Sequence, residues 1–129
     1  MFDGIFIINS ALNVTQLSVF NNEQRFKQTC ETIESIEKYC PNSLKIIFDA
    51  SPHPVDESCL KKLTEYKNTW FLDMGSHEDI RELSLDGLRS QAETYAFMGA
   101  LTWLKGQDFK AKRIYKLSGR YTLTRSEEH

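Results

Sequence analysis

The sequence predicts an α/β fold, a three-layer sandwich in which helices cover both faces of a mainly parallel sheet. Four short apolar runs alternate along the chain with segments of helical periodicity, which is typical of strand–helix–strand units. The 129 residues, 40% of them hydrophobic, are enough for one domain with a sizeable core. Because crossovers between parallel strands are right-handed, we expect about four strands in the order 3-2-1-4.

The predicted strands are short apolar runs that end in small or polar residues. The first, Gly4–Asn9, contains four consecutive apolar residues, which indicates a strand covered on both faces. The other three predicted strands are Leu44–Asp49, Thr69–Leu72 and Arg113–Leu117.

The predicted helices lie between these strands. Apolar residues recur at three- and four-residue steps over Glu23–Tyr39, and Pro41 ends that helix. Shorter helices are expected at Glu57–Tyr66 and His77–Leu85. The strongest signal is Arg89–Lys105, which is apolar over most of its girth and is therefore predicted to be buried between layers.

Residues 1–124 are expected to form the single domain, and the charged residues 125–129 a frayed tail. Three cysteines without a CxxC pair suggest reduced thiols and a cytoplasmic protein. The N-terminus lacks the pattern of a signal peptide, and no apolar run approaches the ~20 residues of a membrane span.

Charge and motifs disfavour several classes of protein. The 16 Lys and Arg residues nearly balance the 18 Asp and Glu residues, so a strongly cationic nucleic-acid binder is disfavoured. The chain has neither a glycine-rich phosphate loop nor HExxH or GxSxG, which disfavours dinucleotide dehydrogenases, P-loop enzymes, zinc proteases and serine hydrolases. No cofactor is evident. A divalent metal is conceivable, but no D-x-D pair is present to hold it.

Polar residues follow the predicted strands, and in a parallel sheet they meet at the edge where ligands bind. Asn9 and Ser10 follow the first strand and could bind a base or ribose. Asp49 and Ser51 follow the second, where Asp49 could accept hydrogen bonds from a ribose. The alternative for Asp49 is a structural role in the turn at Ser51.

The segment Ser118-Gly119-Arg120 after the fourth strand is the most distinctive cluster. Gly119 allows a sharp turn or a close approach to a ligand, and Arg120 could bind a phosphate through two parallel hydrogen bonds. Lys116 alternates in the same sense as Ser118 along this strand. Glu93 is expected to be partly buried and could pair with Arg120. The alternative is a strand end followed by an ordinary turn.

Four segments together resemble the N-terminal nucleotide-binding half of a GT-A glycosyltransferase: IFIINSALN, RFKQTCETIESIEKYCPNSLKIIFDAS, SQAETYAFMGAL and RIYKLSGRY. The chain is more closely similar to uncharacterised bacterial and phage-encoded proteins with a K-[LI]-S-G-R-Y segment. The resemblance covers nearly the whole chain. It implies that Asn9 and Asp49 hold the base and ribose, and that Ser118, Gly119 and Arg120 stand where such enzymes carry the D-x-D motif. The guanidinium of Arg120 would then take the place of the metal beside the diphosphate.

The resulting hypothesis is a nucleotide-sugar-binding, glycosyltransferase-like domain that transfers a sugar if it is active. We expect it to be inactive alone, because the D-x-D motif and the acceptor-binding half are missing from this chain. Two alternatives stay open: a non-catalytic interaction or assembly protein, phage-encoded, that keeps the fold, and a nucleotide-binding regulator. The edge of the fourth strand would be covered by the C-terminal tail or by a second copy in a homodimer.

Overall fold

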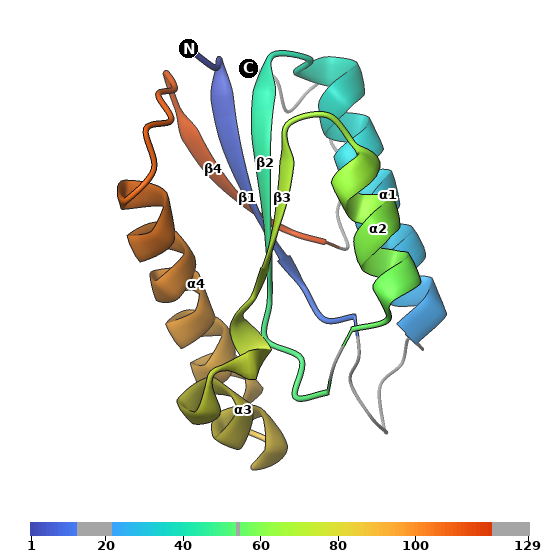
Figure 1. Ribbon diagram of the computed structural model, residues 1–129, viewed down its shortest axis with the longest axis vertical. Helices are drawn as coiled ribbons and strands as arrows, with labels where there is room; N and C mark the ends of the chain where they lie inside the picture. Colours follow the sequence, from blue (N-terminus) through green and yellow to red (C-terminus); the bar gives the residue numbers. More distant parts are fainter. Residues whose placement is uncertain (13–21, 54, 120–129) are drawn as a thin grey trace.

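The computed structural model describes residues 1–12, 22–53 and 55–119 (Figure 1). It confirms the predicted α/β fold with four parallel strands in the order β3-β2-β1-β4. The strands are β1 (Gly4–Ser10), β2 (Ser43–Asp49), β3 (Thr69–Asp73) and β4 (Ile114–Ser118). Each predicted strand is present, with ends that differ by one residue.

Helices cover both faces of the sheet, as Figure 1 shows. On one face lie α1 (Asn22–Tyr39) and α2 (Glu57–Glu65). On the other lie α3 (Glu78–Leu85) and α4 (Arg89–Lys105), which follow the short 3-10 helix η1 (Met74–Ser76). The structure is therefore a three-layer sandwich.

Two hydrophobic clusters fill the spaces between the layers. Side chains of β1 alternate between them, with Ile7 in the cluster under α4 and Ile8 in the cluster under α1. All seven residues of β2 are buried. A strand that is covered on both faces needs apolar residues at consecutive positions, which explains the unbroken apolar runs of β1 and β2.

The prediction that α4 is buried between layers is wrong. Only one stripe of α4 is buried: Ala92, Ala96, Ala100 and Leu104. Tyr95 and Met98 are 58% and 56% exposed, whereas Phe97, Leu101 and Trp103 are half-buried at the edge of the core. The physical reason is that small alanines bring the helix close to the sheet, and no third helical layer of described residues covers its outer face.

A lysine is buried in the layer between α1 and the sheet. The Lys45 side chain lies on β2 and is 2% exposed, and its Nζ is 3.3 Å from Glu37 Oε1 of α1. Burial lowers the pKa of Lys45 because the charged form loses its hydration, although the nearby Glu37 carboxylate opposes this shift. This face therefore accommodates a charge in its interior.

No helix among the described residues is both long enough and apolar enough to cross a bilayer. No disulfide joins Cys30, Cys40 or Cys59. Burial raises the pKa of the Cys30 and Cys59 thiols, so neither has the low pKa of a reactive cysteine. The predicted tail, residues 125–129, lies outside the described residues.

Candidate functional site

The topology creates a crevice between β1 and β4. The chain moves from β1 through α1 to β2 on one side, and it returns through α3 and α4 to place β4 on the other side of β1. The strand order therefore reverses between β1 and β4, the position at which open α/β sheets bind ligands. A cavity of about 40 Å³ lies there, lined by Asn9, Ser10, Ala11, Arg25, Gln28, Thr29, Glu93, Ser118 and Gly119.

The cavity brings together five of the residues that the sequence singled out. Asn9 and Ser10 end β1, and Asn9 pairs in register with Ser118 of β4. The Gly119 amide donates a hydrogen bond of 2.7 Å to the Asn9 carbonyl, which holds the two strand ends together. Glu93, near the start of α4, is half-buried as expected and supplies the cavity's carboxylate.

Gly119 is close to both β1 and α1. A Cβ atom at this position would lie 2.9 Å from the Asn9 carbonyl oxygen and 2.9 Å from Thr29 Oγ1. The Thr32 hydroxyl donates a 3.2 Å hydrogen bond to the Gly119 carbonyl. Gly119 therefore packs closely against strand β1 and helix α1, and its predicted approach to a ligand stays a prediction.

Arg25, Gln28 and Thr29 were not among the predicted site residues. All three line the cavity from α1. A signal was present, because Arg25, Gln28, Thr29 and Thr32 recur at helical spacing and form one polar face. This face begins near the N-terminus of α1, the end of the helix that parallel connections place beside the carboxyl end of the preceding strand.

Two buried oxygens make the cavity chemically distinctive. Asn9 Oδ1 and Gln28 Oε1 are buried and have no hydrogen-bond partner among the described residues. A buried polar atom without a partner costs about 1–3 kcal/mol, so such atoms occur mainly where a ligand or water completes them. The cavity is large enough for a water or for one polar edge of a ligand.

Asp49 and Ser51 lie beside this cavity without lining it. The Asp49 side chain is fully buried, and its carboxylate accepts hydrogen bonds from Ser10 Oγ (2.7 Å), Leu12 N (2.9 Å) and Ser51 N (2.7 Å). The backbone of Gly75 packs directly against the Ser51 carbonyl and closes this part of the edge. These contacts are those of the structural alternative, in which Asp49 stabilises the turn at Ser51.

Burial dominates the ionisation of Asp49. Loss of hydration raises the pKa of its carboxyl, although the hydrogen bonds from Ser51, Ser10 and Leu12 act in the opposite direction. The carboxylate joins the ends of β1 and β2, and it keeps Ser10 in place at the border of the cavity.

Neither basic residue of the predicted site is found in the cavity among the described residues. Lys116 is exposed, and its Nζ lies 4.8 Å from the ring centroid of Phe97 on the α4 face, outside the cavity. Arg120 lies outside the described residues, so its interaction with phosphate stays a prediction. In the described part of the chain, no group of three or more His, Cys, Asp or Glu residues could hold a metal ion.

Comparisons with known proteins find no family model, no curated protein and no solved structure that matches the chain.

Proposed function

We propose that this domain binds a nucleoside diphosphate sugar in the cavity between β1 and β4 and is glycosyltransferase-like. The observation that supports the proposal is the meeting of Asn9, Ser10, Ser118 and Gly119 where the strand order reverses. This is the general ligand position of open parallel sheets. We infer that the domain by itself binds the nucleotide sugar and does not transfer the sugar. With a separate acceptor-binding partner, the reaction would be sugar transfer.

The chemistry of the lining residues suits such a ligand. Asn9 Oδ1 and Gln28 Oε1 need hydrogen-bond donors, which ribose hydroxyls and base amino groups provide. Arg25 also lines the cavity, and Arg120 directly follows Gly119 in the sequence. Guanidinium groups bind phosphate oxygens in pairs, so we assign the diphosphate to Arg120. Because the cavity holds only about 40 Å³, it would take one polar edge of the nucleoside, with the remainder bound at its mouth.

The test is thermal unfolding of the full chain with UDP-, GDP- and CDP-sugars, each with and without Mn²⁺. A ligand that binds only the folded state raises the melting temperature by mass action. We expect a rise with one nucleotide, and we expect Asn9→Ala and Arg120→Ala to remove it. Asn42→Ala is the matched control, because Asn42 lies just before β2 at the opposite edge of the sheet and should leave the shift intact.

Absence of a shift with every nucleotide at millimolar concentration would contradict nucleotide binding. A shift that Arg120→Ala leaves unchanged would overturn the assignment of the diphosphate to Arg120 and would keep nucleotide binding. Circular dichroism of each variant shows whether the fold is retained.

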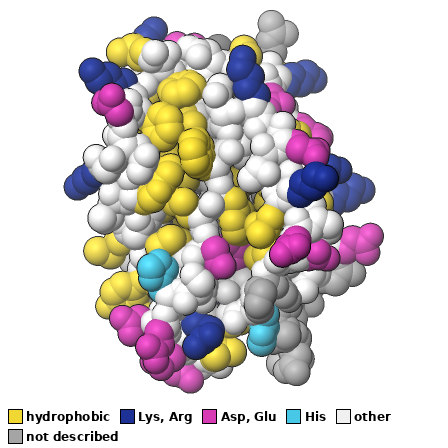
Figure 2. Space-filling view, in the orientation of Figure 1, with side chains coloured by type: hydrophobic (Ala, Val, Ile, Leu, Met, Phe, Trp, Pro, Cys, Tyr) yellow, Lys and Arg dark blue, Asp and Glu magenta, His cyan; other side chains and the backbone are white. Residues whose placement is uncertain are grey.

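A second candidate is a non-catalytic interaction or assembly protein, and exposed apolar surface favours it. Figure 2 shows hydrophobic side chains gathered on the surface between α4 and β3. Trp70 is 48% exposed there, with its ring centroid 5.8 Å from that of Trp103 and 6.2 Å from that of Phe109. Among the described residues, β4 pairs only with β1, and its Ile114 is 57% exposed. Exposed apolar surface of this kind is typical of protein–protein contacts.

This candidate predicts a homodimer formed through the outer edge of β4, which sedimentation equilibrium measures directly. Ile114→Lys should convert the dimer to a monomer, because a charge at an edge strand opposes pairing. Met98→Lys adds the same charge on the outer face of α4 and should leave the dimer unchanged. A monomeric wild type would contradict this candidate.

A further inference from the structure

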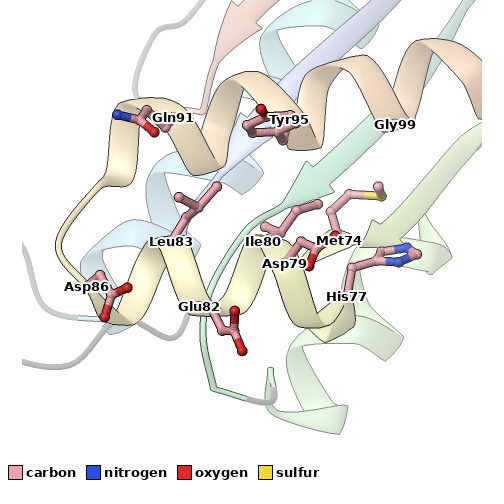
Figure 3. A pocket seen from close by; sticks show the side chains of 10 residues that line it. All are labelled: Met74, His77, Asp79, Ile80, Glu82, Leu83, Asp86, Gln91, Tyr95 and Gly99. Carbon is pink, nitrogen blue, oxygen red and sulfur yellow. The ribbon is translucent and has the colours of Figure 1, made fainter.

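A second and larger cavity lies between α3, η1 and α4. Its volume is about 590 Å³, within the range of small-molecule sites. Figure 3 shows Ile80 and Leu83 rising from α3 toward α4, with Met74 at one end and Tyr95 on the facing helix. These four side chains supply apolar walls. None of the residues proposed to bind the nucleotide lines this cavity.

Three exposed carboxylates, those of Asp79, Glu82 and Asp86, line the cavity together with His77. No lysine or arginine lines it among the described residues. None of the three carboxylates forms an ion pair with another described residue. The cavity therefore combines apolar walls with a negative potential, which opposes binding of phosphate groups and favours a cation.

The position of two of these carboxylates is unfavourable for helix α3 itself. Glu82 lies in the last turn of α3 and Asp86 is its C-cap, and this turn contains no basic residue. The C-terminal end of a helix carries partial negative charge, so acidic side chains lower helix stability there and cations raise it. Asp79 differs, because it lies in the first turn, where the helix dipole stabilises a carboxylate. A cation bound near Glu82 and Asp86 would offset the repulsion.

We propose that this cavity binds a small organic cation, an amine attached to an apolar ring or chain. The apolar part would pack against Ile80, Leu83 and Met74. The ammonium group would lie at the rim of the cavity, beside its exposed carboxylates. The inference does not depend on the proposed nucleotide site, because the two cavities share no lining residue.

Three probes with one ring and different charges test the proposal: phenethylamine, 2-phenylethanol and 3-phenylpropionate. Isothermal titration calorimetry on the full chain gives the three affinities. We expect phenethylamine to bind at least about tenfold more tightly than 3-phenylpropionate, and we expect added salt to weaken it. Equal affinities for the three probes, or no binding of phenethylamine, would overturn the proposal.

Variants locate the amine. Glu82→Gln/Asp86→Asn should weaken phenethylamine at least about tenfold, while the melting temperature of the ligand-free variant rises because the repulsion at the helix end is removed. Asp79→Asn should weaken the amine without that rise. The matched control is Glu57→Gln/Glu65→Gln, which removes two charges at the ends of α2 and should leave amine affinity unchanged. Unchanged affinity in the Glu82→Gln/Asp86→Asn protein would overturn the proposal, and its raised melting temperature would rule out misfolding as the cause of a loss.

Discussion

Before the end of β3, strand β2 buries two charged side chains, whereas after β3 several large apolar side chains are exposed. Asp49 and Lys45 of β2 are almost inaccessible, and both have hydrogen-bond partners. In the second half, Tyr95 and Met98 of α4 and Ile114 of β4 are each more than half exposed. Both halves belong to one parallel sheet.

The difference shows that the place of an element in the layers, more than its composition, decides its burial. A central strand such as β2 is covered on both faces, so even its charged residues Lys45 and Asp49 are enclosed, and both take internal hydrogen-bond partners. An outer helix such as α4 buries only the stripe that contacts the sheet. Substitutions of buried polar residues in the first half should therefore change stability strongly. Substitutions on the exposed outer face of α4 should change stability little and should act mainly on contacts with other molecules.

Asp49→Ala should cause the largest loss of stability. It leaves the amides of Leu12 and Ser51 buried without their carboxylate partner, so we expect the free energy of unfolding to fall by about 3 kcal/mol. Urea denaturation measures it. Asp73→Ala is the matched control, because Asp73 ends the neighbouring strand in register with Asp49 and is exposed. Asp73→Ala should lower the free energy of unfolding by less than about 0.5 kcal/mol. Equal losses in the two variants would contradict the claim that burial makes Asp49 important for stability.

The burial of Asp49 should also make the stability of the protein depend on pH. Because burial raises the pKa of Asp49 in the folded state, the folded protein binds this proton more tightly than the unfolded chain. The resulting stabilisation is present below the unfolded value of about 3.9, and it is lost as pH rises through the folded pKa. Wild type should therefore lose stability relative to Asp49→Asn as pH increases from 3.5 to about 7. A constant difference between the two proteins in urea denaturation would contradict this.

Lys45→Met should act in the opposite direction. It replaces an enclosed ammonium group with an apolar side chain of similar length, while the Glu37 side chain, 35% exposed, keeps contact with water. We expect the free energy of unfolding to rise by about 1–2 kcal/mol. Lys61→Met on the exposed face of α2 serves as the control and should change little. A large loss in Lys45→Met would mean that the ion pair with Glu37 is net stabilising.

In the second half, Gly87→Ala isolates the effect of backbone conformation on stability. Gly87 follows the C-cap of α3 with φ of 81°, a conformation that side chains resist, and no atom would lie within 4 Å of an added Cβ. The loss should be about 1 kcal/mol and purely conformational. Gly106→Ala, after α4 with φ of −78°, has no such strain. Thermal unfolding of the two variants should separate them, and equal melting temperatures would disprove the conformational explanation.

Met98→Gln should have the smallest effect, below about 0.5 kcal/mol in urea denaturation. Its side chain is 56% exposed on the outer face of α4 and has few contacts to lose. A loss above 2 kcal/mol would show that this face is packed more tightly than the exposure indicates.

Part of the candidate site was predictable because its residues follow strand ends. Parallel strands bring their carboxyl ends together, so the sequence alone indicates that Asn9 and Ser118 lie close together, as they do. The contribution of Gln28 and Thr29 depends on the rotation of α1 about its axis, which helical periodicity restricts without specifying. The sequence does not predict the cavity between α3 and α4, because the pattern of Arg89–Lys105 is typical of a helix buried on all sides.

The sequence by itself determined where helices and strands lie, because hydrophobic periodicity and turn residues act over short distances along the chain. It also determined the strand order, since right-handed crossovers exclude most alternatives. Only the tertiary structure decided that Asn9 faces a cavity while Asp49, which ends the next strand in register with Ser10, is enclosed by Ser51 and Gly75. That outcome depends on which loop packs over each strand end, a contact between segments distant in sequence that no local pattern encodes.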